Sequence, residues 1–180
     1  LWGGRFEGGL DEAAKALSFS LHFDYVLFPY DIQVNKAHVT ALQRAGVLSD
    51  DEHSQLHAAL NTVYERYATT ISKANTDDED IHSFVEREVI QEVGDLGKKM
   101  HTGKSRNDQV ATDMRLYMKH EITRCIHALD QLCHALWTLA DATKTMVFPG
   151  FTHLQIAQPV VLAHHFLAYF DKFSRDRQRF

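Results

Sequence analysis

The feature that most constrains this chain of 180 residues is a long stretch without helix breakers. From Lys104 to Phe148 there is no glycine and no proline, the residues that most often interrupt a helix. Apolar residues recur there at alternating steps of three and four, which places them on one helix face. We therefore predict one long helix of the kind that builds helical bundles. The residues on this face are Ile122, Cys125, Leu129, Leu132, Leu136 and Leu139.

Three shorter helices are predicted before the long one, each from apolar residues at helical spacing and from signals at its ends. The glycine-punctuated stretch 94–103, which follows the third of them, is predicted as a loop. The helices are 24–45, stopped by Gly46; 50–67, begun by a capping box of Ser49 and Glu52; and 81–93, stopped by Gly94.

The C-terminal part is predicted as helix, turn and helix. Pro149 and Gly150 end the long helix, and Pro159 suits the first turn of another. The chain stops inside that last helix, so we expect a fragment of a longer protein. No alternating strand pattern exceeds a few residues, which predicts an all-α fold. We expect a helical N-terminal domain over 1–102 and the incomplete start of a central helical bundle over 103–180.

Composition excludes several classes of protein. The 19 lysines and arginines and the 24 aspartates and glutamates give a net charge of −5, which disfavours a nucleic-acid backbone as partner. Hydrophobic residues make up 44%, enough to bury a core, so the chain is not intrinsically disordered. No apolar run approaches the about 20 residues that cross a bilayer, so we expect no membrane partner.

The N-terminus and the cysteines predict the compartment. The chain begins with Leu1 rather than Met, and nothing at its start has the pattern of a secretion signal. On one helix, Cys125 and Cys133 would lie about 12 Å apart, which is too far for a disulfide. We therefore expect reduced cysteines and a cytoplasmic protein.

The stretch from Gly97 to Gln109 has the chemistry of an anion site. Cations and small polar side chains gather there at the start of the long helix, where free N–H groups and the helix dipole favour negative charge. Ser105 and Asn107 offer hydrogen bonds, and Arg106 offers a fork that fits a carboxylate. The alternative is an ordinary helix cap by Ser105 or Asn107, with the cations in solvent.

His153 is a second candidate, in the predicted turn 149–159. Turns held by rigid helices often carry catalytic groups, and an imidazole titrates near neutral pH, so His153 is a candidate general acid or base. The alternative is a structural histidine.

The sequence gives less support to a metal site than to the anion site. Glu79 and His82 share a helix face, but a di-iron centre needs a second such pair, which the chain lacks. The spaced histidines could bind a metal, yet no cysteine or carboxylate completes either set, and a polar helix face explains them more simply. These sets are His53 with His57, and His120, His127 and His134. Four aspartates are interpreted as solvated helix faces: Asp113, Asp130, Asp171 and Asp176.

Several motifs together resemble the N-terminal part of the argininosuccinate lyase family, in the fumarase/aspartase superfamily that also includes the lens δ-crystallins. The resemblance covers nearly the whole chain, and the run Ser-Arg-Asn-Asp-Gln at 105–109 distinguishes this family from its relatives. The matching segments are 1–6, 20–24, 78–82, 101–109 and 150–159.

The resemblance implies a reversible β-elimination that converts argininosuccinate to arginine and fumarate in arginine biosynthesis, without metal or organic cofactor. It implies a cytoplasmic homotetramer when the protein is full length, with active sites that combine regions of more than one subunit. It also assigns residues. Ser105, Arg106 and Asn107 hold substrate carboxylates, Ser20, His82 and Gln155 make further contacts, and the catalytic residues are Thr152, a substrate ligand, and His153, an acid-base group.

The chain departs from the family pattern in places. Lys104 stands where arginine is common, Met100 where leucine is, and Phe151 where tyrosine is. The mobile loop that supplies a proton-transferring serine is absent from these 180 residues, so we expect this chain alone to be inactive. Three alternatives stay open: a structural protein like the inactive δ-crystallins, a His-rich metal-binding bundle, and a superfamily lyase for another substrate such as adenylosuccinate.

Overall fold

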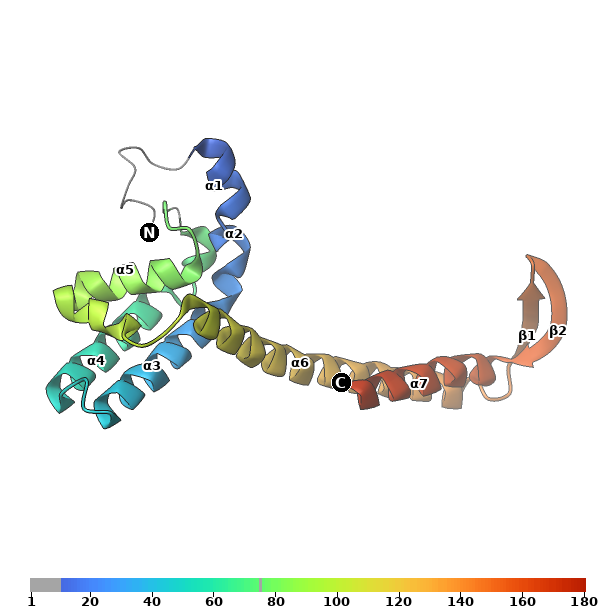
Figure 1. The fold of residues 1–180 in the computed structure, drawn as a ribbon. Helices are drawn as coiled ribbons and strands as arrows, with labels where there is room; N and C mark the ends of the chain where they lie inside the picture. Colours follow the sequence, from blue (N-terminus) through green and yellow to red (C-terminus); the bar gives the residue numbers. More distant parts are fainter. Residues whose placement is uncertain (1–10, 75) are drawn as a thin grey trace. The chain divides into compact units, whose positions relative to one another are not determined.

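The computed structural model describes residues 11–74 and 76–180 and divides the chain into two units, Leu1–Tyr117 and Met118–Phe180 (Figure 1). Within the described residues the first unit contains only helices, and the second contains helices and one hairpin of two strands. The predicted all-α class is thus confirmed, with the hairpin as a local exception.

The first unit is a chain of short and medium helices. Three of them, α3, α4 and α5, pack on one another around a shared core. The helices are α1 (Glu12–Ser18), α2 (Leu21–Asp24), η1 (Tyr25–Leu27), α3 (Phe28–Arg44), α4 (Asp50–Tyr67), η2 (Ile71–Lys73), α5 (Ile81–Val93), η3 (Gly94–His101) and the first part of α6 (Arg106–Ala142).

Apolar residues at helical spacing build this core. Each of the three helices turns one apolar stripe inward and leaves charged residues outside, as an amphipathic helix does. Burying each such side chain stabilises the unit by about 1.5 to 3 kcal/mol before entropy is counted. The fully buried aliphatic residues are Val39, Leu56, Leu60, Val63, Ile81, Val85 and Val89.

The predicted ends of two helices are confirmed. Ser49 and Glu52 form the expected capping box at the start of α4. Helix α5 ends at Gly94, whose φ of 63° is one that glycine adopts without strain. The predicted loop after it is mostly the 3₁₀ helix η3.

The predicted single helix 24–45 is wrong at its start. Residues 21–27 form α2 and η1, and the α-helix α3 begins only at Phe28. Pro29 explains the break, because proline fits the first turn of a helix but cannot donate a hydrogen bond to the preceding turn.

The second unit contains the rest of α6, strands β1 (Val147–Thr152) and β2 (Gln155–Val161), and helix α7 (Leu162–Arg179). The strands pair antiparallel, so the prediction of a helix that reaches Phe148, and of Pro159 in a helix, is wrong. Pro149 and Pro159 lie opposite each other in the register. A two-stranded ribbon tolerates this pair because each strand has a free edge, and the prolines hid the strand pattern in the sequence.

Helices α6 and α7 form an antiparallel pair within this unit. Cys133 and Ala140 of α6 and Ala163 of α7 are buried, and the Trp137 and Phe170 rings lie 5.9 Å apart across the pair. Arg177 and Asp130 form an ion pair at 2.5 Å. The predicted apolar face of α6 is not buried in this unit, as Leu132 and Leu139 are 40% and 47% exposed.

The first turns of α6 belong to the first unit, which ends at Tyr117. The predicted domain boundary at residue 102 stays a prediction. None of the described helices combines the length and the apolar character that a membrane span requires.

Candidate functional site

The predicted anion site lies where α6 begins. The Ser105 Oγ atom accepts a hydrogen bond from the Asn107 N–H at 3.2 Å, and the Ser105 N–H donates to Asp108 Oδ2 at 3.2 Å. The hydroxyl of Ser105 thus satisfies a free N–H in the first turn of α6, and Asp108 in turn accepts the N–H of Ser105. Ser105 therefore caps the helix, and its contact with a ligand stays a prediction. The Asn107 side chain is exposed.

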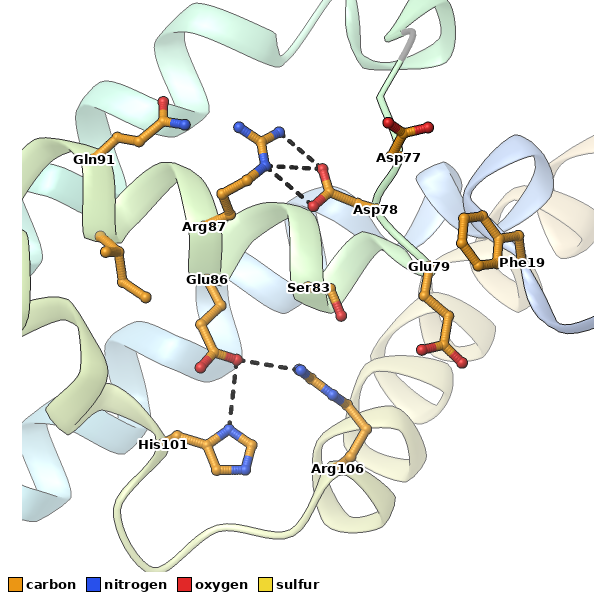
Figure 2. A pocket seen from close by; sticks show the side chains of 11 residues that line it. Phe19, Asp77, Asp78, Glu79, Ser83, Glu86, Arg87, Gln91, His101 and Arg106 are labelled. Carbon is orange, nitrogen blue, oxygen red and sulfur yellow. Dashed lines mark hydrogen bonds and ion pairs between the residues drawn. The ribbon is translucent and has the colours of Figure 1, made fainter. Parts of the chain in front are cut away.

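Arg106 lines a pocket of about 570 Å³ in the first unit (Figure 2). Its Nη2 atom donates to Glu86 Oε2 at 3.2 Å, and its Nη1 atom donates to Gln109 Oε1 at 3.1 Å. His101 Nδ1 lies 3.6 Å from the same Glu86 oxygen. Figure 2 shows Arg106 and His101 both pointing toward the same carboxylate of Glu86. The guanidinium is therefore held in a fixed position at the pocket wall.

The opposite part of the pocket is formed by the segment before α5 and by α5 itself. Arg87 Nη2 donates to Asp78 Oδ2 at 2.8 Å, and this pairing raises the pKa of Arg87. Asp77 and Glu79 also line the wall (Figure 2). Because carboxylates and guanidinium groups share one pocket, it suits a small ligand that carries both charges.

Ser20 lies at the N-terminus of α2 and is tied to the start of α5. Its hydroxyl donates to Asp24 Oδ2 at 2.6 Å, and its backbone N–H donates to the Glu79 carbonyl at 2.8 Å. Asp24 also accepts the Ile81 N–H at 3.2 Å. Burial raises the pKa of Asp24, and the bonds from Ser20 and Ile81 oppose that rise. Ser20 thus lies beside a pocket residue, and its role as a substrate ligand stays a prediction.

His82 faces the interior of the unit. It is 2% exposed, and its Nδ1 atom lies 2.8 Å from Asp31 Oδ1 and 3.3 Å from Asp113 Oδ2. Two carboxylates therefore lie next to the Nδ1 atom of His82. The contact between His82 and substrate that the resemblance implies stays a prediction.

The interpretation of Asp113 as a solvated residue is wrong, since its exposed fraction is 0%. Sequence reasoning also missed its neighbours Asp31 and Asn35, which are buried at 0% and 1%. A signal for both was available. Asp31 and Asn35 share the α3 stripe of Phe28, Ile32 and Val39. A polar residue on an apolar stripe is buried with a partner more often than it is solvated.

Thr152, His153 and Gln155 lie in the second unit, at the tip of the β-hairpin. Thr152 pairs with Gln155, and His153 and Leu154 form the two-residue connection. Both connecting residues have positive φ values, 50° and 65°, as in a type I′ turn. This conformation is uncommon for residues other than glycine and is found at functional sites. All four side chains are exposed, so His153 is accessible to a ligand.

The spaced histidines form no complete metal site within the described residues. The rings of His53 and His57 lie 4.6 Å apart, and their Nε2 atoms lie 3.1 Å and 3.3 Å from Thr40 Oγ1. Across residues 11–74 and 76–180, the one group of three side chains with the spacing of metal ligands is Asp31, His82 and Asp113. The histidines at seven-residue intervals are exposed: His120, His127 and His134.

Comparison with known sequences agrees with the motifs. The model of a family described as "Lyase" matches residues 4–180. Argininosuccinate lyase of Carboxydothermus hydrogenoformans is 46% identical over the whole chain, which covers 40% of that protein. Argininosuccinate lyase of Streptococcus uberis is 42% identical over the whole chain, which covers 39% of that protein. The chain thus spans about two fifths of the length of these relatives.

Solved structures share the fold. An EDDS lyase in complex with formate is 27% identical, with a TM-score of 0.73 over 91% of this chain and 31% of that chain. A variant of EDDS lyase was solved with bound fumarate, at the same identity and TM-score. A fumarate lyase:delta crystallin from Brucella melitensis is 18% identical, with a TM-score of 0.74 over 95% of this chain and 45% of that chain, which supports the fold alone.

Proposed function

The chain belongs to the lyase family whose model it matches over residues 4–180, and from this premise we propose that it is part of an argininosuccinate lyase. The proposed reaction is a β-elimination. A base removes the proton beside one succinyl carboxylate, the bond between carbon and the guanidino nitrogen breaks, and its electron pair leaves with the nitrogen, which takes up a proton. The products are fumarate and arginine.

The observation that carries the proposal is the placement of Arg106. Its guanidinium lies at the wall of a pocket of about 570 Å³, at the start of α6, where the helix dipole adds to its positive charge. Removing the proton places extra negative charge on a succinyl carboxylate. Fixed donors stabilise that charge more in the transition state than in the bound substrate, which is what lowers the barrier.

The composition of the same pocket supports the choice of substrate. Argininosuccinate carries carboxylates at one end and a guanidinium group in its middle. The pocket offers Arg106 for the former and Asp77 and Glu79 for the latter, while Asp78 is paired with Arg87. The identity of 42% and 46% to two argininosuccinate lyases favours this substrate over others that the superfamily uses.

We assign the remaining roles by the same resemblance. His153 acts as the acid-base residue, Thr152, Ser20 and Gln155 bind substrate, and Ser105, Arg106 and Asn107 hold its carboxylates. The resemblance also assigns His82 a contact with substrate. The exposed tip of the hairpin, with His153 and Leu154 at positive φ, suits a segment that completes a ligand site.

We further infer a cytoplasmic homotetramer in arginine biosynthesis that works without metal or organic cofactor. Apolar residues on the surface of the second unit support association. Leu132, Trp137 and Leu139 of α6 are 40%, 57% and 47% exposed, and large exposed apolar residues on one helix are typical of an interface between subunits.

The test is release of fumarate from argininosuccinate, followed by its ultraviolet absorbance. We expect release by the full-length protein that contains this chain and none by the 180-residue chain alone, which lacks the serine loop. Release from adenylosuccinate but not from argininosuccinate would instead identify another lyase of the superfamily. If the full-length protein is folded but releases fumarate from neither argininosuccinate nor adenylosuccinate, a structural role like that of the δ-crystallins is favoured.

A further inference from the structure

Three buried side chains from three helices meet behind the candidate site. Asp31 of α3, His82 of α5 and Asp113 of α6 are 0%, 2% and 0% exposed. Their ligand atoms all lie within 4.8 Å of one another. We call these three residues the buried triad. Two acids so close together and so far from water need a proton or a cation between them.

Asp31 is the acceptor at the centre of the triad. His82 Nδ1 lies 2.8 Å from its Oδ1 atom, and the Gln109 amide donates to the same oxygen. Asn35 Nδ2 donates to its Oδ2 atom at 2.9 Å. A carboxylate that accepts three hydrogen bonds is stabilised in its ionised form, so Asp31 is the charged acid.

Asp113 is the opposite case. Within the described residues neither of its side-chain oxygens has a hydrogen-bond partner, although Oδ2 lies 3.3 Å from His82 Nδ1. Burial, and then the nearby charge of Asp31, raise the pKa of Asp113 to about 8. An ionised carboxylate without partners is costly inside a protein, whereas a neutral acid is tolerated and can donate a hydrogen bond.

One ammonium group balances the remaining charge. Lys104 Nζ donates to Asn35 Oδ1 at 2.6 Å, and Asn35 in turn donates to Asp31. Burial lowers the pKa of Lys104, and the charge of Asp31 opposes that change. The chain of contacts from Lys104 to Asp31 runs from the residues just before α6 into α3.

We propose that the buried triad, with Asp31 ionised and Asp113 protonated, is a positioning device that fixes the first turns of α6 against α3 and α5. Gln109 and Asp113 lie on α6, about one and two turns after Ser105. Gln109 contacts Asp31 of α3, and Asp113 contacts His82 of α5. The triad thereby sets where Arg106 and Asn107 stand. The effect of this placement on catalysis rests on the proposed lyase function, whereas the positioning itself does not.

A proton fits the triad better than a metal ion. A divalent cation would require Asp113 to be ionised and would lie close to the cations Lys104 and Arg106, both of which act on Asp113. It would also compete for Asp31 oxygens that already accept bonds from His82, Gln109 and Asn35. One proton neutralises the second acid without either conflict.

The test compares two isosteric variants, Asp31→Asn and Asp113→Asn, in the full-length protein. The same chemical change should have opposite results. Asparagine replaces a neutral Asp113 well, so we expect the amide hydrogen exchange of residues 106–112 to stay within threefold of the wild type. In Asp31→Asn one amide group meets three donors, so we expect exchange there to accelerate at least tenfold.

A second set of measurements separates positioning from general loss of structure. In Asp31→Asn we expect kcat to fall at least tenfold, while KM changes by less than threefold and exchange in α4 is unchanged. In the wild type, the carboxyl ¹³C resonance of Asp113 should titrate near pH 8, a readout that needs no variant. If the wild type releases no fumarate, the proposed function fails, while the exchange and the titration still test the triad.

Three outcomes would overturn the proposal. Equal acceleration of exchange in both variants would mean that Asp113 is ionised. Titration of the Asp113 carboxyl resonance below pH 5 would also mean that Asp113 is ionised at neutral pH. One equivalent of Mn²⁺ or Zn²⁺ bound by the wild type after dialysis, and lost from both variants, would identify a metal site instead.

Discussion

The Nη2 atom of Arg106 lies 3.2 Å from Oε2 of Glu86, so the guanidinium group that we assign to a substrate carboxylate already has an acidic partner. The contact joins the start of α6 to the middle of α5. Glu86 is partly exposed at the pocket, where a ligand can compete with it. The pair thus holds the Arg106 side chain in position and also weakens its attraction for an anion.

This competition predicts the effect of Glu86→Gln. Glutamine can still accept a hydrogen bond from Arg106 but carries no charge, so the positive potential of the pocket rises. At low ionic strength, we expect the fumarate concentration that inhibits the full-length variant to be at least threefold lower than the concentration that inhibits the wild type. The difference should shrink at high salt, because screening weakens interactions between charges. Weaker inhibition at every salt concentration would count against an anion site beside Glu86.

The anion donors themselves give a second prediction. We expect Arg106→Ala and Asn107→Ala each to lower kcat of the full-length protein by about 10², the usual effect of losing one fixed donor to a developing charge. Arg115→Ala is the matched control, since Arg115 lies on the same helix with an exposed side chain and donates to the Ala111 carbonyl. A loss below threefold in both variants would place the anion site elsewhere.

Local signals in the sequence predicted most of the first unit. The capping box at Ser49 and the glycine after α5 are short-range devices, in which a side chain or a missing Cβ satisfies the backbone directly. The periodicity of α6 is equally local. Such features are readable because nothing distant in the chain decides them.

The failures concern residues whose environment is set by tertiary structure. Asp113 has the spacing of a surface residue, and only the packing of α6 on α3 and α5 makes it a buried acid. In the hairpin, two prolines suggested helix boundaries, and only their pairing across β1 and β2 makes a strand possible at each. Among the predicted site residues, the local assignment of Ser105 as a helix cap matches the structure, while ligand contacts depend on groups that the chain alone does not reveal.

The buried triad predicts how stability depends on pH. The pKa of Asp113 rises from 3.8 in the unfolded chain to about 8 in the folded one. Between these values the folded state keeps a proton that the unfolded state releases, so the free energy of unfolding falls as pH rises, by up to about 1.4 kcal/mol per unit. Its contribution to stability is greatest below pH 4 and is lost by pH 8.

Urea unfolding of the wild type and of Asp113→Asn between pH 5 and pH 8 measures this dependence. Asparagine does not titrate, so the variant should lose that part of the slope and should be at least as stable as the wild type at pH 7.5. Parallel curves for the two proteins would show that Asp113 does not carry the extra proton.

Gly97 gives a prediction about packing. A Cβ atom at this position would lie 2.9 Å from the Cα atom of Ile90 and 3.0 Å from its backbone nitrogen. Backbone atoms of a helix cannot move aside cheaply, so η3 would have to shift away from α5. We expect Gly97→Ala to lower the free energy of unfolding by about 1 to 3 kcal/mol. The exposed neighbour Lys98 provides the control, since Lys98→Ala should change it by no more than about 0.5 kcal/mol.

The cap of α4 gives the last prediction. Ser49 Oγ accepts the Glu52 N–H at 3.2 Å, and the Glu52 carboxylate accepts the Ser49 N–H at 2.9 Å. Lys99 also binds Glu52, at 2.5 Å, which lowers the pKa of this carboxyl group and links η3 to the cap. Ser49→Ala removes one acceptor for a free helical N–H, so we expect a loss of about 1 kcal/mol in urea unfolding.

Ser54→Ala is the matched control for that variant. Ser54 lies on the same helix and is exposed, and its hydroxyl only donates to the Asp50 carbonyl, which the helix already uses. Alanine also favours a helix more than serine does, so this variant should be neutral or slightly more stable. Equal losses in the two variants would indicate that the hydroxyl at position 49 does not cap α4 in solution, because only its position at the helix start distinguishes it from the hydroxyl at position 54.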